Sequence, residues 1–92
     1  MPSKEEYFEI SYNGSISVKE KYQSFLQGKL SVPATLNNVA VTAGDRFGSL
    51  LTHVFFLGNT IGRIGGSAFS GNTNLKSVFM PNSVTDIGPG AF

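Results

Sequence analysis

Few side chains in this sequence are of the types that carry out acid–base or metal chemistry. His53 is the only histidine and there is no cysteine, so His53 lacks partners of the kinds that form a zinc site or a general acid–base pair. The chain has six carboxylates, which are Glu5, Glu6, Glu9, Glu20, Asp45 and Asp86. None recurs at a spacing that suits paired acid catalysis or calcium binding. We therefore expect a non-enzymatic protein with no catalytic residue, no metal ligand and no cofactor, in which His53 lies on a strand surface.

Two polar residues fit structural roles better than chemical ones. Asp45 directly follows Gly44, and we expect its side chain to cap or tighten a corner of the chain. Asn72 lies three residues after Phe69, and we expect its amide to be buried and to satisfy backbone groups of a loop.

The elements that would position these residues follow from an internal repeat. Residues 64–69 (IGGSAF) recur 23 positions later as residues 87–92 (IGPGAF). Residues 30–39 overlay residues 78–87 at an offset of 48. Repeats of about 20–50 residues are typical of stacked units that cannot bury their apolar faces alone, so the sequence predicts a short solenoid.

A third copy lies midway between these two. Leu51, Val54 and Phe56 precede the equivalent residues of the last copy by 24 positions. The segment 56–64 then contains one residue more than its counterpart. The chain is therefore expected to hold three strand–turn–strand units, and solenoids of this kind usually serve as binding surfaces.

Alternation within each unit predicts which side chains face the core. In the last unit Val78 and Met80 point inward, Phe79 points outward, and Pro81 ends the strand because it has no N–H to donate. Stacking the units places equivalent inward side chains in rows. The expected rows are Val32, Phe56 and Met80; Leu36, Ile61 and Val84; Val39, Ile64 and Ile87; and Phe47, Phe69 and Phe92.

The N-terminal part is expected to close one end of the stack. Asn13-Gly14 lies between two alternating runs, which is a strong hairpin signal in which both turn positions take positive φ. We expect this hairpin, residues 7–18, to cover Leu30 and Val32. The predicted organisation is a disordered tail at 1–6, a capping hairpin and loop at 7–28 (with 19–28 a loop or a single helical turn), and about three repeats at 29–92, the last one truncated.

These repeats resemble the BspA-type, or Treponema-type, leucine-rich repeat, whose units read roughly L-x-x-V/I-x-I-P-x-S-V-x-x-I-G-x-x-A-F. Asn72 holds that family's Cys or Asn position after Phe69. The segment before the repeats is similar to the family's N-terminal part through Tyr12, Gly14, Ile16, Leu30, Val32, Pro33, Thr35, Val41, Thr42, Gly44, Asp45 and Phe47. The resemblance implies a mostly β leucine-rich-repeat solenoid located at a bacterial cell surface or secreted.

Composition narrows the choice of partners. The net charge is +1, only 14% of residues are charged and there is no basic stripe, so we expect no nucleic-acid partner. No run approaches the roughly 18 apolar residues of a membrane helix, so we expect no membrane insertion. The N-terminus is polar and unlike a signal peptide. Since residues 87–92 also close a repeat motif, we expect the chain to be a fragment of a longer surface protein, able to self-associate through its open C-terminal end.

One outward row contains large apolar side chains that the fold does not require. Ser31, Phe55 and Phe79 are spaced by 24 residues and should form one ladder on the concave sheet. The candidate partner-binding face consists of this ladder and a polar row two residues earlier, formed by Lys29, His53 and Ser77. Exposed apolar patches tend to mark contacts. Alternatively, the two phenylalanines only shield each other as a cross-strand pair, or the strand register is shifted by one residue.

The function most consistent with these observations is non-catalytic protein binding. The resemblance implies an adhesion module that contacts a host or neighbouring-cell protein, which is an argument by analogy of fold. The first alternative is a structural spacer or capping segment of a larger surface protein. A carbohydrate-binding module has less support, because the chain has no Trp and its three Tyr fall outside the ladder.

Overall fold

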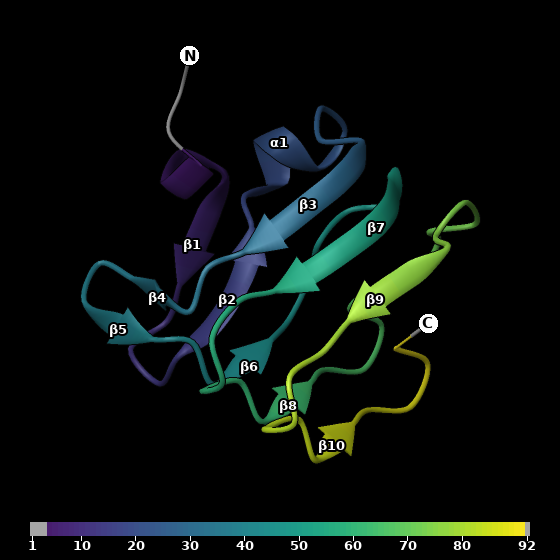
Figure 1. Cartoon of the computed structure of the whole chain (residues 1–92). Coiled ribbons are helices and arrows are strands. Elements are labelled where there is room, and N and C mark those ends of the chain that lie inside the picture. The colour runs from purple at the N-terminus through teal and green to yellow at the C-terminus, as the bar shows by residue number, and fades with distance from the viewer. Residues whose placement is uncertain (1–3, 92) are drawn as a thin grey trace.

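The chain folds into a β-solenoid of about three stacked turns, seen here in a computed structural model that describes residues 4–91 (Figure 1). Its helices are a 3₁₀ helix, Lys4–Tyr7, and α1, Glu20–Gln23. Its strands are β1 (Phe8–Ile10), β2 (Ser15–Val18), β3 (Gly28–Val32), β4 (Thr35–Leu36), β5 (Val39–Ala40), β6 (Ala43–Gly44), β7 (Leu51–Phe56), β8 (Arg63–Ile64), β9 (Ser77–Phe79) and β10 (Asp86–Ile87).

Each turn of the solenoid contributes one strand to each of two sheets. The first sheet has the order β3-β7-β9 and is parallel throughout. The second sheet has the order β1-β2-β6-β8-β10 and is parallel except between β1 and β2. The mostly β, parallel-strand solenoid predicted from the repeat is therefore confirmed.

The core lies between the two sheets and is centred on aromatic rings. Val32 and Phe56 are buried as predicted, and Met80, in the last turn, is partly buried against them. Phe47 and Phe69 are fully buried and stack with their ring centroids 5.0 Å apart. This confirms the predicted row of Phe47, Phe69 and Phe92 for the first two turns. Phe92 lies outside the described residues.

The predicted rows that begin with Leu36 and with Val39 are wrong in the first turn. Gly44, and not Val39, pairs with Ile64, which in turn pairs with Ile87. The same register places Val41, and not Leu36, beside Ile61. Val41 and Ile61 are buried, whereas Ile87 is 48% exposed because β10 has a strand neighbour on one side only in the described structure.

The cause of this shift is an extra hairpin. Gly44 follows Val32 by 12 positions, whereas Ile64 follows Phe56 by 8. The additional residues form the antiparallel pair β4–β5, in which Leu36 pairs with Val39. The two residues between them, Asn37 and Asn38, have φ of 52° and 66°, as a two-residue hairpin with type I′ geometry requires.

The N-terminal hairpin forms as predicted but with a different turn. Phe8 pairs with Val18 and Ile10 with Ile16. Only Gly14 has positive φ, and its N–H donates to the Ser11 carbonyl, which is the pattern of a type I turn followed by a bulge. The Asn13-Gly14 signal therefore located the hairpin correctly, while the expectation of positive φ at both residues was wrong.

The hairpin extends the second sheet at the N-terminal end of the stack. β2 pairs in parallel with β6, so that Ile16 lies opposite Gly44. Phe8, Ile16 and Val18 are buried in the same cluster as Leu30 and Val32. The predicted capping role thus takes the form of two added strands.

The remaining N-terminal elements are short. The expected disordered tail, 1–6, is replaced by helix over Lys4–Tyr7 in its described part, and residues 1–3 lie outside the described residues. The single helical turn expected within 19–28 is α1. Tyr22 packs edge-on against Tyr7 with centroids 5.1 Å apart.

Docking of the hairpin depends on the absence of a side chain at Gly14. A Cβ at Gly14 would lie 2.7 Å from the Ala40 carbonyl and closer still to Thr42 Oγ1. Gly28 also has positive φ, but a Cβ there would meet nothing within 4 Å. Gly28→Ala should therefore cost only backbone strain, about 1–2 kcal/mol. Gly14→Ala should cost a further 1–3 kcal/mol, approximately, from the steric conflict.

Urea unfolding of both variants measures this difference. An equal loss of stability in Gly14→Ala and Gly28→Ala would contradict the close docking of the hairpin on the first turn.

Candidate functional site

The predicted outward row is present on the first sheet. Ser31 pairs with Phe55, and Phe55 with Phe79, across β3, β7 and β9. The rings of Phe55 and Phe79 have their centroids 6.4 Å apart at an angle of 46°. Phe79 is 72% exposed and Phe55 is half-buried. We call Ser31, Phe55 and Phe79 the outer ladder.

The polar row also lies where the spacing places it. Lys29 pairs with His53, and His53 with Ser77, so these side chains run beside the outer ladder. Lys29 and Ser77 are exposed, and His53 is half-buried. The structure therefore brings all six candidate residues together on one face.

This register follows from the inward side chains of the same strands. Leu30, Val54 and Val78 face inward between the ladder and the polar row, and the first two are buried. A shift of one residue would expose them and bury Lys29 and His53, which is costly for a charged amine. The alternative of a register shifted by one is thus excluded for this sheet.

His53 supplies the one imidazole of this face. Nδ1 of His53 lies 2.9 Å from the Thr52 hydroxyl, a neighbour in sequence. Within residues 4–91, no three His, Cys, Asp or Glu side chains gather closely enough to hold a metal ion. The six residues thus combine an apolar ring pair with an amine, an imidazole and hydroxyl groups.

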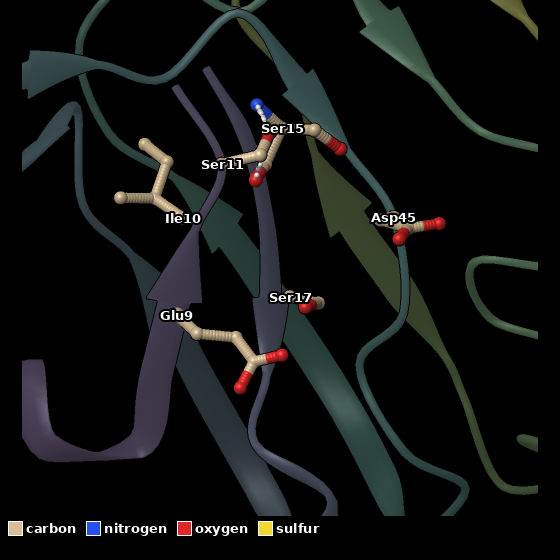
Figure 2. Close-up of a pocket in the computed structure, with 6 residues that line it drawn as sticks. All are labelled: Glu9, Ile10, Ser11, Ser15, Ser17 and Asp45. Atoms are coloured by element: carbon tan, nitrogen blue, oxygen red, sulfur yellow. Dashed lines mark hydrogen bonds between the residues drawn. The ribbon is translucent and has the colours of Figure 1, made fainter. Parts of the chain in front are cut away.

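A polar hollow of about 350 Å³ lies on the outer face of the second sheet (Figure 2). It collects Glu9 from β1, Ser15 and Ser17 from β2, and Asp45 from the corner after β6. Glu9 and Asp45 are both exposed to solvent. The hollow is thus a solvated polar surface whose two carboxylates need no partner.

Asp45 does not cap its corner as expected. Its backbone N–H donates to the Ile16 carbonyl over 2.8 Å, which ties the corner to the capping hairpin. The described residues supply no hydrogen bond to its exposed carboxylate. The corner is therefore held by the main chain of Asp45 and not by its side chain.

Asn72 has the structural role predicted for it, although it is partly and not fully buried. Its Oδ1 accepts a hydrogen bond from the Leu51 N–H over 2.8 Å. Its Nδ2 donates to the carbonyls of Gly48 and Phe69 over 2.7 and 3.1 Å. One amide thereby joins the loops of two successive turns.

The sequence reasoning missed a cavity at the N-terminal edge of the first sheet. It has a volume of about 250 Å³ and is lined by Tyr7, Phe8, Leu26, Lys29, Leu30 and Ser31. The apolar pattern signalled the burial of Phe8 and Leu30. No local signal shows that Tyr7 and Leu26, 19 residues apart, meet at the same place.

Comparison with known proteins adds no relative. The chain matches no family model, no curated protein and no solved structure. In the part of the chain that the structure describes, no helix is both long and apolar enough to cross a membrane.

Truncation to alanine should destabilise the fold much more at Phe69 than at His53. His53→Ala removes a half-buried strand-surface side chain and should change the free energy of unfolding by about 0.5 kcal/mol or less. Phe69→Ala removes a buried ring that stacks on Phe47 and should cost about 3–5 kcal/mol. Thermal unfolding followed by circular dichroism compares them. The reverse ranking would show that His53, and not Phe69, supports the fold.

Proposed function

We propose that this protein is a non-catalytic binding module that contacts a protein partner through the outer ladder. The observation that carries the proposal is that Phe79 is 72% exposed. Its ring lies in line with Phe55 on a regular sheet. The fold does not require a phenylalanine at this position, because Ser31 occupies the equivalent position of the first turn.

The energetics favour a contact role. Burying a phenylalanine side chain from water contributes about 1.5–3 kcal/mol. An aromatic anchor surrounded by polar groups is the usual composition of an interface hot spot. Lys29, His53 and Ser77 supply such a polar border on one side of the ladder.

The resemblance of the sequence to BspA-type leucine-rich repeats supports a more specific role. Under that resemblance the module belongs to a bacterial surface or secreted protein and binds a host or neighbouring-cell protein. This step is analogy from the repeat pattern and carries less weight than the ladder itself.

A second candidate, a structural spacer or capping segment of a larger surface protein, is favoured by one observation. Ile87 on β10 is 48% exposed although equivalent to the fully buried Ile64. A further repeat or a second copy of the chain would cover it. In that case Phe55 and Phe79 would only shield each other.

The double variant Phe55→Ser, Phe79→Ser separates the two functions. It gives the ladder the residue type already found at Ser31, so stability should change by less than about 1 kcal/mol. Beads coated with the protein would be tested for attachment to a panel of purified extracellular-matrix proteins and to intact cells. Leu57→Ser, which removes an exposed apolar side chain outside the ladder, is the matched control.

We expect attachment of the double variant to fall by roughly tenfold or more, which corresponds to losing the burial of about one ring. We expect Leu57→Ser to attach as the wild type does. Equal attachment of wild type and double variant would contradict the ladder as the contact surface. Self-association that persists in the double variant would favour the spacer.

A further inference from the structure

The two sheets of the solenoid have unequal numbers of strands at the N-terminal end. β3 and β6 belong to the same turn, but the second sheet continues beyond β6 with β2 and β1, whereas the first sheet stops at β3. In Figure 1, β3 forms the side of the first sheet nearest to β1 and α1. The first sheet therefore lacks strands where the second sheet has two.

The free edge of β3 presents unpaired main-chain groups. The Val32 carbonyl accepts a hydrogen bond from the Leu57 N–H over 2.9 Å, so Val32 directs its peptide groups towards β7. Successive residues of a strand alternate in this direction. Lys29 and Ser31 therefore direct their N–H and C=O groups away from β7, where the described residues offer no strand partner.

An apolar cavity lies directly against this edge. The cavity of about 250 Å³ is bounded by β3 residues 29–31 on one side and by Tyr7 and Phe8 on the other, with Leu26 beside them. Leu30 and Phe8 are almost fully buried, so the cavity leads towards the core. A strand added to β3 would direct every second side chain into it.

The positive charge of Lys29 at this edge favours a partner segment with acidic side chains. Lys29 is the one charged residue lining the cavity, and its exposed side chain lies on the outer face of β3. A strand added beside β3 would place its outward side chains next to Lys29, where a carboxylate is favoured. The favoured segment thus alternates apolar residues, facing the cavity, with acidic residues, facing outward.

We propose that the free edge of β3 binds an extended segment of a partner protein as a fourth strand of the first sheet. The segment pairs its main chain with Lys29 and Ser31, inserts an apolar side chain against Phe8, Leu26 and Leu30, and sets an acidic side chain beside Lys29. In this mode the main-chain hydrogen bonds provide affinity and the cavity provides selectivity. The site shares Ser31 with the outer ladder but engages its main chain, because the added strand continues the sheet, whereas a ladder partner lies across the sheet face.

The test uses blocked five-residue peptides with the whole chain. The probe is acetyl-Glu-Leu-Glu-Leu-Glu-amide, and the charge control is acetyl-Lys-Leu-Lys-Leu-Lys-amide. Binding is followed by the amide resonances of the ¹⁵N-labelled protein. We expect the acidic peptide to shift the Lys29 and Ser31 amides and to slow hydrogen exchange at Ser31, with the basic peptide binding at least tenfold more weakly, approximately.

Variants at Ser31 and Lys29 test the main-chain contact and the charge. Ser31→Pro removes the edge N–H without removing a β3–β7 hydrogen bond, and proline is tolerated on edge strands. Ser31→Ala, which keeps the N–H, is the matched control. We expect roughly a tenfold loss of binding for the proline variant and less than about twofold for the alanine variant. Lys29→Glu should reverse the preference between the two peptides.

A peptide methylated at its amide nitrogens provides a test that leaves the protein unchanged, and it should lose affinity as Ser31→Pro does. Four results would overturn the proposal. They are no binding of the acidic peptide at millimolar concentration, equal binding of Ser31→Pro and Ser31→Ala, resonance shifts confined to Phe55 and Phe79, or sedimentation of a dimer that Ser31→Pro, but not Ser31→Ala, converts to a monomer. Retention of peptide binding in the Phe55→Ser, Phe79→Ser variant would support the edge site independently of the proposed ladder function.

Discussion

The stacking of Phe47 on Phe69 is the interaction on which the rest of this structure depends. The two rings are fully buried with centroids 5.0 Å apart, close to the separation of hydrogen-bonded strands, and Phe56 packs edge-on against both. One turn of the solenoid is thereby set directly upon the next. With fewer than a hundred residues available, no single turn could exclude water from these rings alone. The turns are stable only as a stack.

Fixing the inward side chains also determines the outer face. Since side chains alternate along a strand, burial of Leu30 and Val54 forces Ser31 and Phe55 outward at the same level. The outer ladder is therefore a consequence of core packing, whatever residues occupy it. Its composition can vary at little cost to the core, which is why a phenylalanine 72% exposed on β9 is informative.

The sequence predicted the parts of the structure in which successive turns have equal spacing. Phe55 and Phe79 could be placed in one ladder because β7 and β9 keep the 24-residue spacing of the repeat. Only the part of the first turn after Val32 could not be aligned in this way, because Asn37 and Asn38 divert the chain into a hairpin that the repeat pattern does not contain. The cavity beside β3 was also beyond sequence reasoning, since it exists only where Tyr7 meets Leu26 in three dimensions.

The ladder and the β3 edge differ in what a partner would recognise. The ladder offers rings whose contribution depends on side-chain identity, so a substitution such as serine for Phe79 abolishes it while the backbone stays unchanged. The edge offers peptide groups of Lys29 and Ser31 that almost any side chain leaves intact, and only its cavity and its single positive charge are selective. Because edge strands left open tend to pair with other chains, a free edge beside a cavity is a liability unless a segment occupies it. The two surfaces can therefore change independently, the ladder through substitutions on β7 and β9 and the edge through the packing of Tyr7 and Leu26 against β3.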